Sequence, residues 1–461
     1  MHVEFFGATK EVTGACFLVH VGKHRILIDC GLIQGNYADE QRNYAPFPFN
    51  PAQINAVVLS HAHLDHSGRL PLLLKKGFQG AIYTQTASRD LARIMLRDAA
   101  FLNQKESEWN NKKRLRKGLT PLTPLYSIAE ANVAVRRMRT LPYGQTHTIV
   151  PGVSLTLHDA GHILGSSIVE LRCTEAGQHR TLVYSGDLGH SGAPILRDPA
   201  PIEHADLLLL ESTYGNRRHR DWDATWEELG HTLMQAQKGG GNILIPAFAI
   251  GRTQELLYLF KRHYQEWEMN RWQIFLDSPL AIEATTIYSQ HAALYDAEAH
   301  RMHHDGDPFS PPNLHYCKTA VQSIAINRLQ GGAIIIAGSG MCDGGRIKHH
   351  LKHHLWRNNC HVIFSGFQAR GTLGRRIVDG AAFVRLWGET IKVNAQIHTI
   401  GGLSAHADQT GLLKWLDGFH APPRVALVHG EVEAMEGLRD KLHADRALNA
   451  VLPQFGEHLD L

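Results

Sequence analysis

The sequence contains few of the features that mark secreted, membrane or low-complexity proteins. Its six cysteines are scattered and form no CxxC pair, which favours reduced, buried thiols in a cytoplasmic protein. No apolar run approaches the roughly 18 residues of a membrane span. The N-terminus lacks the basic stretch and the long apolar segment of a signal peptide. We therefore expect a globular, cytoplasmic protein that has no membrane partner.

Net charge and length further limit which class of protein this is and what it can bind. The formal net charge of the 461 residues is only +3, so a polyanionic partner would need local basic patches rather than a field over the whole surface. Hydrophobic residues make up 43% of the chain and charged residues 20%, as in an ordinary globular protein. A chain of this length can bury a large core, and we expect two domains.

Two different patterns of predicted secondary structure, here called textures, divide the chain. The first two hundred residues predict many short strands, among them a hairpin at 15–21 and 24–31, with helices at 88–109 and 127–141 and an exposed basic segment at 110–124. From about residue 222 the pattern becomes strand, loop and helix, three times over, which favours a parallel sheet covered by helices. The first texture returns near the C-terminus. We predict one α/β domain inserted into another, with boundaries at 1–208, 209–392 and 393–461.

Several apolar runs end in a residue that can bind a metal ion. These residues are Asp29, His61, Asp187, Glu211 and His429. One such strand end means little, but several indicate a layer of polar residues along one edge of the sheets, where α/β proteins usually place their sites.

The stretch LSHAHLDHSG, residues 59–68, places three histidines and an aspartate within six residues. Imidazole and carboxylate ligands suit Zn²⁺, with Mn²⁺ or iron as competitors. A short loop cannot easily aim four ligands at one ion, but it can serve two adjacent ions, and His162, Asp187 and His429 could complete them. The alternatives are a closed structural zinc site or a polar turn without metal. Closed sites normally use cysteine, and none lies nearby.

These motifs, in this order, resemble the signature of the metallo-β-lactamase superfamily. SHAHLDHSG, His162, Asp187 and Asp29 match its metal motifs, while Glu211 in ESTYG, His406 in SAHAD and His429 in VHGE match the three additional motifs of its β-CASP branch. That branch contains nucleic-acid nucleases, including the nuclease subunit of the cleavage and polyadenylation specificity factor. The resemblance covers nearly the whole chain, and compact bacterial members are closest in size.

The resemblance implies a fold, a cofactor and a ligand set. The fold would be an α/β metallo-β-lactamase αββα sandwich with an inserted β-CASP domain, a parallel sheet flanked by helices. Two Zn²⁺ ions, replaceable by Mn²⁺, would bind per protomer. One would be held by His61, His63 and His162, and the other by Asp65, His66 and His429. Asp187 would bridge them, Asp29 would orient a ligand, and His406, hydrogen-bonded to Glu211, would act as general acid.

The implied activity is a zinc-dependent ribonuclease that hydrolyses phosphodiester bonds of single-stranded RNA, by endonucleolytic or 5′→3′ exonucleolytic cleavage, and leaves 5′-phosphate and 3′-hydroxyl ends. His429 favours RNA over DNA, because DNA enzymes of the branch tend to carry valine there. The alternative is a non-nuclease hydrolase of small esters or thioesters, against which the long insert and the Glu211 and His406 motifs argue. Intact ligands argue against a nuclease-dead RNA-binding subunit. Members of the branch often form homodimers.

Candidate RNA contacts lie in glycine-rich loops that precede helices of the insert. Backbone amides at helix N-termini and arginine side chains attract phosphate. The candidates are Arg252, Ser339, Gly340, Arg346, Arg370 and Arg375. The basic run at 112–117 is a second candidate, although a charge run is usually a solvated face.

Overall fold

A computed structural model describes residues 1–369 and 371–461, which form two compact units. The first unit consists of Met1–Ser191, Asp198–Arg218 and His406–Leu461. The insert unit consists of Gly192–Arg197 and His219–Ala405. Among the described residues, no helix is both long enough and apolar enough to cross a membrane.

The first unit contains two seven-stranded sheets. The first sheet contains, in spatial order, β22 (His458–Asp460), β1 (His2–Phe5), β2 (Phe17–Val21), β3 (His24–Ile28), β4 (Ala56–Val58), β5 (Ala81–Thr84) and β6 (Met138–Thr140). The second contains β21 (Ala450–Val451), β20 (Arg424–Val428), β11 (Leu207–Glu211), β10 (Gln178–Tyr184), β9 (Ser167–Glu175), β8 (Val153–Asp159) and β7 (His147–Val150). The predicted hairpin is confirmed as the antiparallel pair β2–β3.

The two sheets pack face to face around one apolar core. Alternation along the strands supplies this core, since Val3 and Phe5 of β1 point inward while their neighbours point outward. Val169 and Leu171 of β9 meet them from the second sheet. The outer face of the second sheet is covered by α13 (Gln409–Leu416) and α14 (Val432–Arg446). The layers are those of the expected αββα sandwich.

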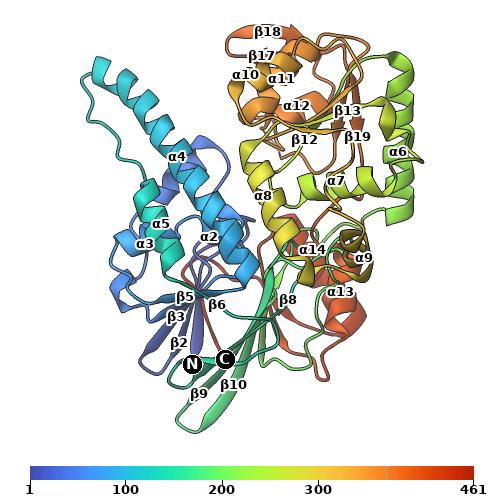
Figure 1. Ribbon diagram of the computed structural model, residues 1–461. Helices are drawn as coiled ribbons and strands as arrows, with labels where there is room; N and C mark the ends of the chain where they lie inside the picture. Colours follow the sequence, from blue (N-terminus) through green and yellow to red (C-terminus); the bar gives the residue numbers. More distant parts are fainter. Residues whose placement is uncertain (370) are drawn as a thin grey trace. The chain divides into compact units, whose positions relative to one another are not determined.

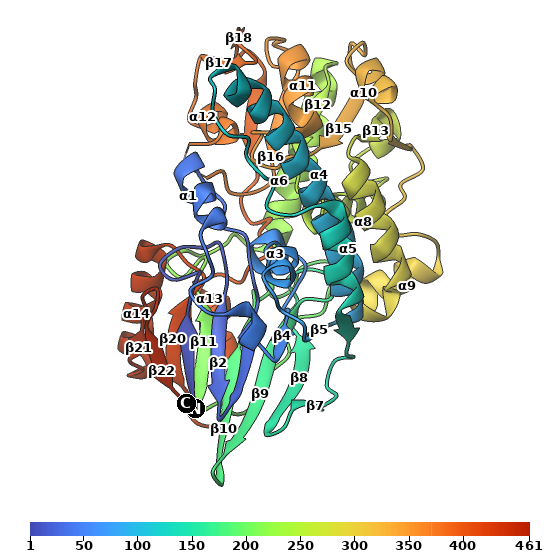
Figure 2. The same cartoon turned by 90° about the vertical axis from the view of Figure 1, so that its left-hand side faces the viewer.

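The helices beside the first sheet are α1 (Tyr37–Gln41), α2 (Leu64–Ser67), α3 (Leu70–Lys75), α4 (Thr86–Arg116) and α5 (Ile128–Arg136). Helices α4 and α5 lie side by side (Figures 1 and 2). The prediction that the helix ends before residue 110 was wrong, because α4 continues through the basic run. Lysine and arginine are good helix formers, and the helix ends only near Gly118, whose positive φ an L-residue rarely adopts.

The insert unit is built on a six-stranded sheet in which every pair is parallel. Its order is β14 (Leu314–Tyr316), β13 (Gln273–Leu276), β15 (Ala333–Ala337), β12 (Ile243–Pro246), β16 (His361–Phe364) and β19 (Gln396–Thr399). The helices are α6 (Trp222–Gly239), α7 (Arg252–Arg262), α8 (Pro279–Gln290), α9 (Ala297–His304), α10 (Ala320–Ile326), α11 (Gly345–His354) and α12 (Leu373–Val378). The parallel sheet predicted for this region is confirmed.

Along the chain, the main segment of the insert unit begins at His219 and ends at Ala405. The sequence pattern placed these boundaries at 208/209 and 392/393. The second difference has a physical reason. Strand β19 pairs in parallel with β16 and so completes the sheet of the insert. The hairpin of β17 (Phe383–Leu386) and β18 (Glu389–Lys392) precedes it.

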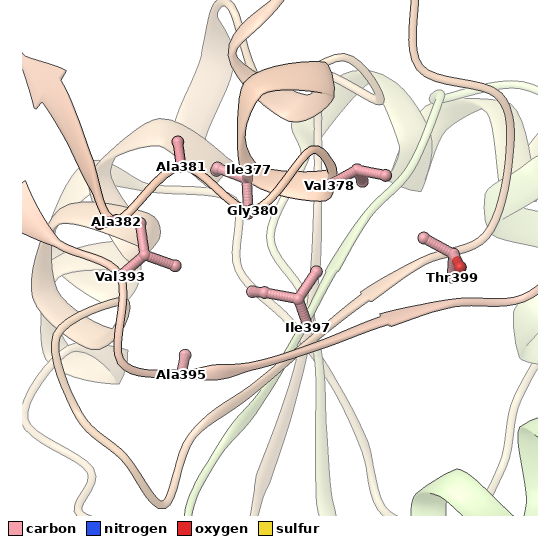
Figure 3. A pocket seen from close by; sticks show the side chains of 9 residues that line it. All are labelled: Ile377, Val378, Gly380, Ala381, Ala382, Val393, Ala395, Ile397 and Thr399. Carbon is pink, nitrogen blue, oxygen red and sulfur yellow. The ribbon is translucent and has the colours of Figure 1, made fainter.

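An open pocket of about 360 Å³ lies in the insert unit, between the end of α12 and β19 (Figure 3). Its lining consists of Ile377, Val378, Gly380, Ala381, Ala382, Val393, Ala395, Ile397 and Thr399. No titratable side chain among the described residues lines it, so we assign it no part in acid–base or metal chemistry.

A buried carboxylate organises the opposite end of this sheet. Asp277, just after β13, accepts hydrogen bonds from Ser323 at 2.6 Å, from Arg346 at 2.6 Å and from His350 at 2.7 Å. Burial favours the neutral acid, but the hydrogen bonds from His350, Ser323 and Arg346 outweigh it and lower the pKa of Asp277. The hydrogen bonds from Arg346 and His350 connect helix α11 to Asp277 at the end of β13.

We predict that Asp277→Asn destabilises the insert unit by on the order of 3 kcal/mol, because it leaves the Arg346 guanidinium and the buried His350 without their carboxylate. A depressed pKa adds stability above the unfolded pKa of about 3.9, and this stability is lost as pH falls through the folded pKa. Acid denaturation of the variant should therefore be less steep. Urea unfolding at pH 7 and pH 4 measures both effects. Equal stability of variant and wild type at pH 7 would contradict the prediction.

Candidate metal centre

Parallel strand pairing brings the candidate ligands to one edge of the two sheets. Strands β3 and β4 run parallel in the first sheet, and β10, β11 and β20 run parallel in the second. Their carboxyl ends therefore lie at corresponding edges. At these ends lie Asp29, His61, Asp187, Glu211 and His429. The layer of polar strand ends inferred from the sequence is confirmed.

One group of donors comprises His61, His63, His162 and Asp187, whose donor atoms all lie within 4.8 Å of one another. The His61 Nε2 atom lies 3.1 Å from His63 Nδ1, and His162 Nε2 lies 3.3 Å from the same atom. Oδ2 of Asp187 lies 3.5 Å from His61 Nε2 and 3.6 Å from His162 Nε2. This is the first ligand set that the resemblance implies.

The second group comprises Asp65, His66 and His429. The Nε2 atoms of His66 and His429 lie 3.1 Å apart, and Asp65 Oδ2 lies 3.6 Å from His429 Nε2. Helix α2 begins directly after His63, so Asp65 and His66 fall in its first turn, and the His66 ring lies beside the His61 ring with centroids 4.0 Å apart. Gly31 makes this turn possible, since a Cβ atom there would lie 1.5 Å from the carbonyl oxygen of Asp65.

Asp187 lies between the groups and offers each of them one oxygen. Its Oδ2 faces His61 and His162, while its Oδ1 lies 3.4 Å from His66 Nε2 and 3.5 Å from His429 Nδ1. The carboxylate is 2% exposed, yet Oδ1 accepts no aligned hydrogen bond. A buried oxygen without a donor is costly unless something else satisfies it.

These residues fit a pair of zinc ions. Ligand atoms about 2.0–2.1 Å from a tetrahedral zinc ion lie roughly 3.3 Å from one another, close to the donor separations found here. Imidazoles surround the Asp187 carboxylate, and its Oδ1 atom, which accepts no aligned hydrogen bond, faces the second group. The donors are nitrogen and oxygen atoms, which zinc accepts and which Mn²⁺ can also use.

Asp29 orients His66, a member of the second group of donors. Its Oδ2 lies 2.7 Å from His66 Nδ1, so Nδ1–H donates to the carboxylate and Nε2 faces the other donors. Asp29 also accepts from the Ser60 backbone N–H and hydroxyl, each at 2.7 Å. The Ser60 hydroxyl oxygen lies 3.1 Å from His61 Nδ1, so Ser60 orients an imidazole of the first group as well.

Two hydroxyl residues that hold the histidines were missed by the sequence reasoning. Ser60 is one, and Thr213 is the other, with its Oγ1 atom 3.1 Å from His429 Nδ1. Serine and threonine carry no metal-binding signal of their own. The only hint was position, because Ser60 directly precedes His61 and Thr213 follows Glu211 by two residues.

The charges in the site reinforce one another. Burial raises the pKa of a carboxyl group, but the neighbouring imidazoles, His429 and His66 first, outweigh it and hold the pKa of Asp187 well below its usual value. Burial and the neighbouring His66 lower the pKa of His61. His61 is therefore favoured as a neutral ligand and Asp187 as an ionised one, as metal binding needs. Asp187 and Asp65, however, outweigh burial and raise the pKa of His66 well above its usual value, so His66 must release a proton when a metal ion binds there.

Glu211 and His406 form a pair at the margin of this centre. The His406 Nδ1 atom lies 3.2 Å from Glu211 Oε1 and 4.0 Å from Asp187 Oδ2. Glu211 is fully buried and accepts a hydrogen bond from the Leu188 N–H at 2.7 Å, which fixes its orientation. Burial opposes the imidazolium, but Glu211 and then Asp187 outweigh it and raise the pKa of His406 to about 9.

The candidate RNA contacts lie in the insert unit, where several already have partners. Arg252 pairs with Glu255 and Arg375 with Asp379. The Arg346 guanidinium donates to Asp277 and to two backbone carbonyls. In the loop after β15, the Ser339 hydroxyl contacts Gly344, and the Gly340 carbonyl accepts from Gln368. Arg370 lies outside the described residues. RNA contact at these positions stays a prediction.

An αββα sandwich with two histidine groups joined by a buried aspartate defines a metal-dependent hydrolase of the metallo-β-lactamase type. Three family models match the chain in agreement with this class. They are a metallo-β-lactamase superfamily domain at 18–206, a β-CASP domain at 253–377, and a Zn-dependent metallo-hydrolase RNA specificity domain at 390–453.

Known proteins match over almost the full length. A ribonuclease of Thermus thermophilus is 39% identical over 99% of both chains. A transcription termination factor of Methanocaldococcus jannaschii is 31% identical over 94% of this chain and 67% of its own. A protein of unknown function from Enterococcus faecalis shares the fold, with a TM-score of 0.58 at 15% identity over 100% of this chain and 99% of its own. The chain belongs to the β-CASP branch of the metallo-β-lactamase superfamily and is a metal-dependent nuclease.

We predict that Asp29→Asn weakens metal binding by about 10–100-fold, because an outer-shell partner of a ligating histidine fixes its tautomer and orientation. Competition with a chromophoric chelator on the metal-stripped protein measures the change. Asp440→Asn, an exposed position on α14, serves as the matched control and should bind like wild type. Wild-type affinity in the Asp29 variant would show that the hydrogen bond to His66 does not control the site.

Proposed function

We propose that the chain is a zinc-dependent ribonuclease that hydrolyses single-stranded RNA and leaves 5′-phosphate and 3′-hydroxyl ends. The single observation that carries the proposal is the Asp187 carboxylate, which offers one oxygen to each of two histidine groups beside the His406–Glu211 pair. Two zinc ions per protomer account best for seven converging ligands, since a catalytic zinc usually takes three protein ligands and a water.

Several residues of the chain would have separate roles in the proposed hydrolysis. Bound zinc would supply Lewis acidity, which acidifies water and neutralises phosphate charge. Asp187 sets the separation of the two donor groups, and Asp29 and Ser60 hold their imidazoles in place. Glu211 fixes the Nδ1 side of His406 and stabilises its protonated form. His406 then donates a proton from Nε2 to the leaving 3′ oxygen, which develops negative charge as the bond breaks.

Several observations support RNA as the substrate. The RNA specificity domain model spans both His406 and His429, and the Thermus thermophilus relative is itself named a ribonuclease. A small-ester hydrolase would have no use for a buried glutamate that holds a second histidine at the margin of the metal centre. The six cysteines are buried and form no disulfide bond, which supports a reducing, cytoplasmic location. We also propose that the chain forms a homodimer.

We expect purified protein to cleave 5′- and 3′-labelled single-stranded RNA, to lose this activity with a chelator and to regain it with Zn²⁺. Asp187→Ala should abolish cleavage and lower the bound zinc while the far-UV circular dichroism stays native, because the bridging ligand positions both donor groups. The two labels separate endonucleolytic from 5′→3′ exonucleolytic products. Chelator-resistant cleavage, or full activity of Asp187→Ala, would refute the proposal.

We expect His406→Asn to slow cleavage by about 10²–10⁴-fold, the usual contribution of a general acid, with little change in RNA affinity. Glu211→Gln should slow it less and shift the alkaline limb of the rate profile to lower pH, since the partner that stabilises the charged imidazole is weakened. Both variants should retain wild-type zinc, because neither residue is assigned as a ligand. Loss of zinc in His406→Asn would mean that His406 is a ligand. His420→Asn, an exposed position, is the control.

A further inference from the structure

A second set of metal-binding side chains lies on the outer face of the first sheet, on strands that carry the two chain ends. His2 and Glu4 occupy alternate positions of β1 and so point to the same side, while Val3 and Phe5 between and beside them enter the core. His20 of β2 lies directly opposite His2, and His458 of β22 lies directly opposite Glu4. Antiparallel pairing thus gathers three histidines and a glutamate on one surface.

The contacts within this set are close. The donor atoms of His2, Glu4 and His20 all lie within 4.8 Å of one another, and His20 Nε2 lies 2.7 Å from Glu4 Oε2. The His2 and His20 rings are stacked with centroids 4.3 Å apart, and His458 lies edge-on to His2 at 5.6 Å. His458 is outside the group of donors that lie within 4.8 Å of one another, so its side chain would have to rotate to bring a fourth donor to an ion held by the other three.

The charge environment suits a cation. Burial, together with His20 and His458, lowers the pKa of His2. Glu4 contributes a carboxylate to the cluster, and Asp460 of β22 lies opposite His2 of β1 in the strand register. Of the cationic groups nearby, Arg25 donates to Gln53, the Met1 amine pairs with Glu175, and Arg424 donates to the Asp460 carbonyl.

The set is separate from the metal centre already described. Strand β3 runs toward that centre, so in the antiparallel hairpin the Phe17 end of β2 lies near it and the His20 end lies far from it. On β1, His2 pairs with His20 and Phe5 with Phe17. The histidine set therefore occupies the opposite end of the same strands.

We propose that His2, Glu4, His20 and His458 form a binding site for one divalent transition-metal ion of the zinc class, which fastens the C-terminal strand to the first sheet. Three imidazoles and a carboxylate are a full tetrahedral ligand set for zinc. Strand β22 has only three residues and hydrogen-bonds to β1 alone in its sheet, so it is a natural place for local opening.

A metal ion at this position would join both chain ends. Strand β21 belongs to the second sheet and β22 to the first, so the C-terminal segment crosses from one sheet to the other. The N and C labels lie next to each other in both views (Figures 1 and 2). An ion held by β1, β2 and β22 would therefore link the chain termini and secure this crossing.

The test compares wild type with His20→Gln, both stripped with a chelator and equilibrated in buffered Zn²⁺. Elemental analysis should find one zinc ion fewer per chain in the variant, and this difference does not depend on how many ions the catalytic centre holds. Titration should show the additional site at least about tenfold weaker in Glu4→Gln, because even an outer-shell partner contributes that much. His179→Gln, an exposed strand histidine of the same unit, is the matched control.

Hydrogen exchange supplies a second readout. Zinc should slow exchange of the β22 amides in wild type but not in His20→Gln, whereas RNA cleavage should be the same in both. Equal zinc content and equal affinity in wild type, His20→Gln and Glu4→Gln would overturn the proposal. If His20→Gln does not fold, Glu4→Gln, which keeps the side-chain shape, decides the matter on stoichiometry and exchange. Ni²⁺ and Cu²⁺, tested in parallel, would show which ion of the class binds best.

Discussion

The Asp187 carboxylate is the constraint on which the rest of the structure depends. It is a buried anion with one oxygen directed to each of two histidine groups, and its neighbours satisfy it only in part. Isolated buried charge is very costly. The surrounding fold therefore has to deliver cationic or metal-bound partners to both oxygens at once. Parallel strands that end at one edge of each sheet do this, because each contributes a single polar residue after an apolar run.

Asp29, His61, Asp187, Glu211 and His429 could be located from the sequence because each one ends such a run, and the density of the HxHxDH stretch favours a metal site there. Two residues that support these side chains could not be predicted. Ser60 and Thr213 hold imidazoles through hydroxyl groups, and a hydroxyl beside a strand end is too common to single out. The domain textures located the insert, yet β19 was read as part of the first domain. An isolated strand carries no mark of the sheet that it joins, which depends on tertiary pairing.

The basic run shows a different limit. Lysine and arginine continue a helix as readily as they coat a loop, so composition alone did not separate the two at 110–116. In the structure the run forms the last turns of α4, where Lys113 lies over the exposed ring of Trp109 at 3.3 Å. Spacing of four residues places these two side chains on one helix face. The end of α4 thus presents cations and an aromatic ring together.

That arrangement bears on where RNA is attracted. Single strands bind through cations along the backbone and aromatic rings against the bases. In the insert, Arg346 is committed to Asp277 and to backbone carbonyls, so reversing its charge would disturb the fold as well as any contact with phosphate. A loss of RNA binding in such a variant would not identify an RNA contact. At the end of α4, Arg114 donates to the Thr120 carbonyl in an exposed hydrogen bond and the exposed Lys113 lies over Trp109, so charge changes there would disturb less of the buried structure. The salt dependence of RNA binding in such variants would test whether these cations contact phosphate.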